Sequence, residues 1–135
     1  MGTNRLLPWS ILTALLLSAT ACSPPPSRII GTWKNDWAIE RGEMTDKGGL
    51  VLSADGTMEH SVYLPDGSSQ QSKGTYQYAD EFLVVTETES FSTDTSGVRK
   101  ALPPRVWGGP VTFFSSNEIK INDPEYGPIT LVRHK

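Results

Sequence analysis

The sequence contains a single cysteine, Cys22, among its 135 residues. A disulfide within the chain is therefore impossible, and the cysteine clusters that bind zinc are excluded. A lone thiol is unusual in an exported protein, because exported thiols normally find partners. The position of Cys22 needs its own explanation.

Long hydrophobic runs are also missing. The longest, residues 6–17 (LLPWSILTALLL), is interrupted by Pro8 and falls short of the roughly 20 residues that a membrane-spanning helix needs. Arg5 precedes this run and the small residues 19–21 follow it, which is the order of a secretory signal peptide. An ordinary cut at this point would leave Cys22 as the first mature residue, with a free thiol.

The pair Ala21-Cys22, placed after that apolar run, resembles the lipobox of bacterial lipoproteins. The resemblance implies that residues 1–21 are a lipoprotein signal peptide and that Cys22 carries fatty chains such as palmitate, which anchor the protein to a membrane. The proline-rich residues 22–28 would form a short acylated tether. Ser23, in place of Asp, implies the outer membrane of enteric-type bacteria, facing the periplasm.

Basic residues are few. The chain has 12 Lys and Arg against 15 Asp and Glu, and Arg99-Lys100 with nearby Arg105 is its largest basic group. Nucleic acid is excluded as a partner because phosphate binding needs clustered cations.

Helical periodicity is absent, whereas alternation of apolar and polar residues recurs between turn signals every 8 to 12 residues or so. We expect one all-β domain over residues 29–135, an antiparallel meander of about eight strands that forms a small barrel or half-barrel. The expected strands are residues 29–36, 49–53, 57–64, 72–78, 82–88, 111–114, 118–122 and 129–133.

Two turns fix the pairing of their strands. A three-residue loop at 54–56, with Gly56 in the left-handed region, sets Leu52 opposite Met58 and keeps the apolar residues on one face. By the same reasoning, the loop at 115–117 sets Phe113 opposite Ile119.

Three segments, GTWK (residues 31–34), ADGTM (54–58) and GTYQY (74–78), resemble the small lipocalin-like domains of many bacterial lipoproteins. In lipocalins a Gly-x-Trp on the first strand packs its indole across one end of the barrel. The resemblance gives that role to Trp33, and it implies a ligand held within the barrel.

Residues 89–110 are rich in Ser, Thr, Gly and Pro and are expected to be an irregular loop, either functional or partly disordered. An extended hairpin around residues 95–97 is the alternative. Trp107 in this segment would be either a rim aromatic or lid, or a plug of the barrel mouth.

Catalytic groups are scarce. Of the two histidines, His134 is next to the last residue, and His60 is expected either in the core or as a polar handle for a ligand. Glu87 and Glu89 share a strand face and are expected to be solvated. The sequence has no Gly-x-Ser-x-Gly elbow and no phosphate-binding glycine loop, so we expect no enzyme, no metal and no cofactor.

Two functions remain. The first is a cell-envelope lipoprotein that binds a small apolar or amphipathic ligand in the barrel, although the same aromatic residues could simply fill the interior. The second is a protein-interaction module, such as an accessory, inhibitor or immunity-type factor of an envelope assembly. The expected ligand-binding residues are Trp33, His60, Tyr76, Tyr78, Phe82, Trp107 and Phe113.

Overall fold

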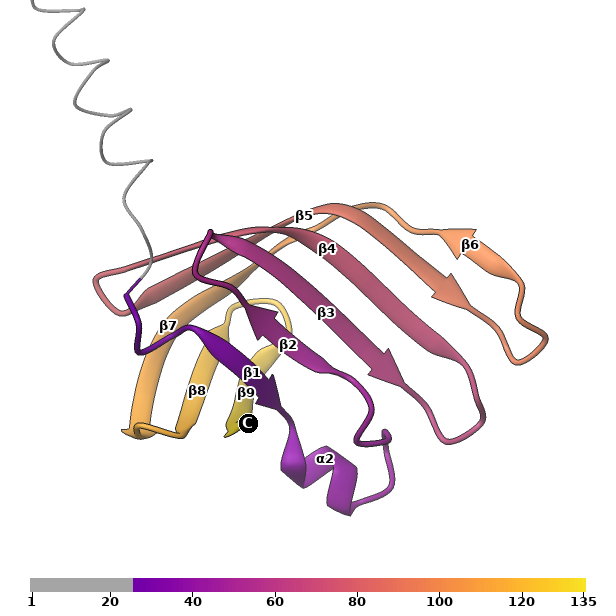
Figure 1. The fold of residues 1–135 in the computed structure, drawn as a ribbon, viewed down its shortest axis with the longest axis horizontal. Helices are drawn as coiled ribbons and strands as arrows, with labels where there is room; N and C mark the ends of the chain where they lie inside the picture. Colours follow the sequence, from indigo (N-terminus) through magenta and orange to yellow (C-terminus); the bar gives the residue numbers. More distant parts are fainter. Residues whose placement is uncertain (1–25) are drawn as a thin grey trace, which may run out of the picture.

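The computed structural model describes residues 26–135, which form a closed antiparallel β-barrel with one short helix (Figure 1). The expectations for the signal peptide and for acylation of Cys22 lie outside the described residues. The elements in chain order are β1 (Gly31–Lys34), α2 (Asp36–Glu40), β2 (Gly49–Leu52), β3 (Thr57–Tyr63), β4 (Ser69–Ala79), β5 (Phe82–Thr93), β6 (Arg99–Ala101), β7 (Val106–Ser115), β8 (Glu118–Asp123) and β9 (Gly127–His134).

Neighbouring strands pair almost entirely in chain order. The nine-stranded sheet runs β4-β3-β2-β1-β9-β8-β7-β5-β6, and the additional pairing of β4 with β5 closes eight of these strands into the barrel. The first strand meets the last, with Trp33 opposite Arg133. The expected all-β meander of about eight strands is confirmed, and the barrel is closed.

The two predicted turn registers are also confirmed. Leu52 pairs with Met58, and Gly56 adopts φ +87°, as the three-residue loop requires. Phe113 pairs with Ile119 as predicted, but the three-residue loop at 115–117 is wrong, because Ser115 belongs to β7 and pairs with Glu118, and Phe114 is the extra residue. Alternation therefore determined which face of each hairpin enters the core.

The barrel interior is filled by apolar side chains from every barrel strand. Trp33 is fully buried in this interior, and its indole Nε1 donates a hydrogen bond of 2.9 Å to the Ile29 carbonyl oxygen. The Arg133 guanidinium lies over the face of the Trp33 ring, 4.3 Å from the ring centroid. The remaining buried core residues are Ile29, Leu50, Leu52, Met58, Tyr76, Tyr78, Leu83, Val85, Val111, Ile119, Ile121 and Leu131.

Residues 89–110 are mostly strand, and the expectation of an irregular loop is wrong. β5 continues to Thr93, β6 pairs back onto it with Lys100 opposite Ser92, and β7 begins at Val106. Asp94 closes the hairpin between β5 and β6, because its carboxylate accepts the Ser96 and Val98 backbone N–H groups at 2.9 Å. The extended-hairpin alternative is the correct one.

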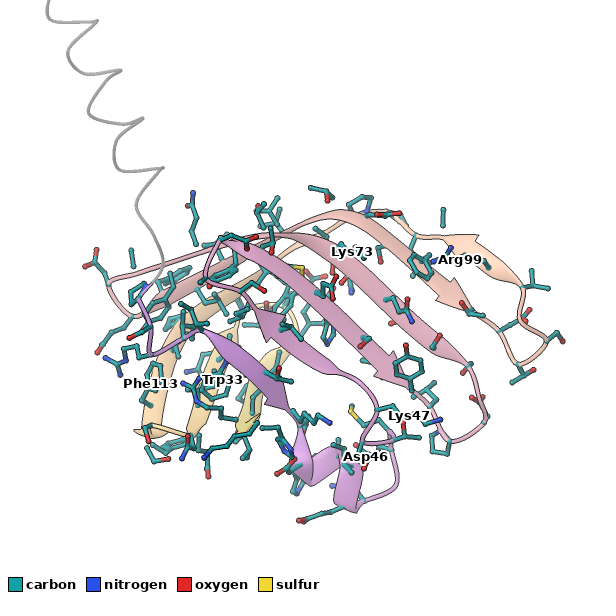
Figure 2. The ribbon with its side chains drawn as sticks, viewed as in Figure 1. Trp33, Asp46, Lys47, Lys73, Arg99 and Phe113 are labelled. Atoms are coloured by element: carbon teal, nitrogen blue, oxygen red, sulfur yellow. The ribbon has the colours of Figure 1, made fainter. Side chains whose placement is uncertain are left out.

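An arm projects beyond the barrel and consists of residues 62–72 and 89–101 (Figure 1). β3 pairs with β2 only as far as Ser61, and β5 pairs with β7 only as far as Thr86, so the later parts of these strands leave the closed barrel. Figure 2 shows Arg99 on this arm, well away from Trp33 and Phe113. The free edge of β6 is only three residues long and carries Arg99 and Lys100, both features that discourage edge-to-edge association.

Candidate functional site

A cavity of about 300 Å³ lies at the end of the barrel beside α2. Its floor is apolar and comes from the barrel core, with Trp33, Leu50 and Leu131. Its other lining residues are Lys34, Asn35, Ile39, Met44, Thr45, Gly48, Gly49, His60, Ser61, Val62, Arg105, Trp107, Tyr126 and Ile129. The cavity therefore combines a hydrophobic floor with a polar mouth.

The helix α2 and the loop after it form one wall. The Asn35 side chain caps the helix by accepting the Ala38 backbone N–H at 3.0 Å, which satisfies one donor that the first turn leaves free. Ala38 is buried against the barrel, and Ile39 beside it faces the cavity. The Thr45 N–H then donates to the Tyr63 carbonyl at 2.7 Å, which ties the loop to the end of β3.

A buried carboxylate supports the opposite wall. The Glu87 side chain is 1 % exposed, and its Oε1 accepts the Arg105 backbone N–H at 3.0 Å. Its Oε2 accepts the Trp107 indole N–H at 3.3 Å, and the Glu87 N–H donates to the Arg105 carbonyl at 2.9 Å. These bonds set the orientation of Trp107 and of the residues that lead into β7.

The expectation that Glu87 is solvated and shares a face with Glu89 is wrong. The register of β4 against β5 shifts between Lys73 and Gly74, so that Gly74 pairs with Glu87 and Lys73 pairs with Glu89. Thr88 is thus an extra residue, a β-bulge, which reverses the alternation beyond it. Glu87 points into the barrel, whereas Glu89 is exposed.

His60 lies against Trp107, with 5.8 Å between ring centroids and an interplanar angle of 54°. Burial lowers the pKa of His60 below its usual value, Glu87 opposes this shift and Arg105 adds to it. The imidazole is therefore neutral near pH 7, with one nitrogen as donor and the other as acceptor. It offers the cavity a polar group without a charge.

The structure divides the seven expected ligand-binding residues into groups. Trp33, His60 and Trp107 line the cavity. Tyr76, Tyr78 and Phe113 lie toward the other end of the barrel and do not line the cavity. There the Tyr76 hydroxyl donates to the Ser53 carbonyl at 2.7 Å, and Tyr78 packs edge-on to Phe113 at 6.4 Å.

Phe82 is on the outer surface, 46 % exposed, so its expected place in the barrel interior is corrected. The tight turn at Asp80 and Glu81 pairs Ala79 with Phe82, which turns the next residue, Leu83, inward. Sequence reasoning missed Lys34, Arg105 and Tyr126 at the cavity mouth. The contact between Arg105 and Tyr126 joins residues far apart in sequence, and no local pattern signals it.

Two further properties concern residues 26–135 alone. They contain no group of three or more His, Cys, Asp or Glu side chains arranged to hold a metal ion. None of their helical segments has the length and hydropathy that crossing a bilayer requires. Comparison of the chain with protein-family models, with curated proteins and with solved structures found no match.

Proposed function

We propose that this protein binds a small amphipathic ligand in the cavity beside α2, as a binding protein rather than an enzyme. The observation that carries the proposal is the cavity itself, with about 300 Å³ over a floor of Trp33, Leu50 and Leu131. That volume is at the lower end of the range of about 300–1,000 Å³ for small-molecule pockets, which are largely apolar with a few polar groups. The neutral His60 and the Trp107 indole fit this description.

We also propose that Cys22 is acylated and holds the barrel at the surface of a bacterial outer membrane, on the periplasmic side. The described chain begins at the end of the barrel away from the cavity, where the Arg28 guanidinium lies 3.8 Å from the Phe113 ring centroid. A tether at this end would leave the cavity mouth free to exchange ligand. Incorporation of labelled palmitate that Cys22→Ala abolishes would support the anchor, and unchanged labelling or membrane association of that variant would contradict it.

Native mass spectrometry of the full chain from its own host, followed by lipid extraction, tests the ligand proposal. We expect a small amphiphile to co-purify, and Trp107→Leu to reduce its occupancy because Trp107 forms part of the cavity wall. Trp37→Leu is the matched control, since Trp37 is 60 % exposed on the outer side of α2. Protein that is free of small molecules and is unchanged by addition of amphiphiles would overturn the proposal.

A protein-interaction module is the second candidate. Leu64 and Val98 leave apolar surface exposed on the projecting arm, and exposed apolar surface is typical of contact sites. Ligand-free protein that captures one envelope partner, and loses it with Val98→Ser but not with Trp107→Leu, would favour this function over the first.

A further inference from the structure

The charged residues that line the cavity are of one sign. Lys34 and Arg105 line the cavity, and none of its lining residues within the described chain is Asp or Glu. The whole sequence has the opposite balance, with more acidic than basic residues. The mouth therefore differs in charge from the rest of the protein.

Lys34 is held without a carboxylate partner. Its Nζ donates to the Asp46 backbone carbonyl, and it forms no ion pair within residues 26–135. Because a carbonyl dipole does not cancel a full charge, the ammonium group still favours an anion at the mouth.

Arg105 is the better placed of the two cations. Its side chain is 50 % exposed, and its Nη1 donates to the Tyr126 hydroxyl. Its Nε forms an ion pair with Glu87 Oε1 at 3.8 Å, a distance too long for a hydrogen bond. The two oxygens of Glu87 already accept N–H groups from the Arg105 backbone and Trp107, so the guanidinium remains available to a second carboxylate.

Two buried carboxylates oppose this preference. Glu87 forms an ion pair with Arg105. The pKa of Asp123 is lowered chiefly by the Gly108 and Tyr126 backbone N–H groups, and the charge of Arg105 adds to this. Asp123 accepts backbone N–H groups from Gly108, Glu125 and Tyr126, each at 2.8 Å. Their charges reduce the positive potential at the mouth, but Lys34 and Arg105 are the charged side chains that line the cavity.

We propose, building on the proposed function, that the ligand is a single-chain anionic amphiphile. Its carboxylate or phosphate head is bound by Arg105 at the mouth, with Lys34 nearby, and its apolar chain lies over Trp33. A guanidinium suits either head group because its planar N–H groups match two oxygens at once. Neutral His60 lines the cavity but adds no charge to head-group selection.

Four probes with the same ten-carbon chain test the proposal by calorimetry on the full chain stripped of lipid. They are decanoate, decyl phosphate, decanol and decyltrimethylammonium. We expect at least one of the two anions to bind about ten-fold or more tightly than decanol, and the cation to bind most weakly. The preferred anion identifies the head group as carboxylate or phosphate.

Arg105→Gln should reduce anion affinity to near that of decanol and leave decanol binding largely unchanged. Arg99→Gln is the matched control, because Arg99 lies on the arm against Phe91 and should have no effect. Glu87→Gln should strengthen anion binding, since it removes the opposing charge behind Arg105.

The outcomes separate the two proposals. If none of the probes binds, the proposed function fails. If the amphiphiles bind without preference for an anion, or if Arg105→Gln leaves the preference intact, only the present inference is overturned.

Discussion

The Asp123 carboxylate accepts the Gly108 backbone N–H at 2.8 Å, from the end of β8 to the beginning of β7. Its other oxygen accepts the N–H groups of Glu125 and Tyr126, also at 2.8 Å. One buried side chain thus fixes the β8–β9 turn and the neighbouring strand. The turn carries Tyr126, so the same carboxylate helps to position the cavity mouth.

Removing that carboxylate should destabilise the fold. Asp123→Ala leaves three N–H donors without their acceptor, and we expect a loss of about 1–3 kcal/mol in the free energy of unfolding. Asp123→Asn keeps one acceptor oxygen and should lose less. Urea denaturation measures both, and an Ala variant as stable as the parent would show that water replaces the carboxylate.

His60 should make the stability depend on pH. Burial lowers its pKa in the folded protein, so the unfolded chain takes up the proton first as the pH falls below about 6.5. The contribution of neutral His60 to the free energy of unfolding is complete above about pH 6.5. It decreases as the pH falls toward the pKa of His60 in the folded protein, by up to about 1.4 kcal/mol per pH unit. Urea midpoints across this range should show a flatter profile for His60→Gln, and an identical profile would contradict a neutral, partly buried imidazole.

Trp33→Phe should cost about 1–3 kcal/mol of stability. The substitution removes the indole donor to the Ile29 carbonyl and leaves a cavity beside the Arg133 guanidinium. Thermal or urea unfolding measures the loss. Trp37→Phe is the control at an exposed position, where we expect a change within about 0.5 kcal/mol. Equal losses for the two variants would contradict the central place of Trp33.

Glu81→Gly should stabilise the protein by roughly 1 kcal/mol. Asp80 and Glu81 form the two-residue turn between β4 and β5 with φ of 52° and 60°, a conformation that side chains with a Cβ disfavour. Gly56→Ala introduces the same strain at φ +87° and should destabilise by a similar amount. Changes of the same sign in the two variants would contradict the argument.

Local sequence patterns were sufficient for the barrel and its hairpins. Alternation and turn residues placed Leu52 opposite Met58, because one wrong step would have exposed a whole apolar row. Alternation and turn residues could not predict the bulge at Thr88, because no residue type in this strand distinguishes an extra residue from a paired one. The Ser- and Thr-rich arm looked like a loop for a related reason, namely that strands outside the barrel need few apolar residues.

The candidate site was less predictable. Trp33, His60 and Trp107 have aromatic or titratable side chains on expected inward faces, and they line the cavity. Arg105 and Tyr126 come together only when β7 and the β8–β9 turn meet in three dimensions. Side chains that precede a strand or lie in a turn have no periodicity from which their direction can be read.

The pairing of β1 with β9 also constrains when the chain can fold. Trp33 pairs with Arg133, so the seam cannot close until β9 is available, about 100 residues after β1. Contacts between such distant residues make folding slow. Closure of the barrel therefore waits for β9, whereas the β2–β3 and β7–β8 hairpins depend only on contacts close in sequence.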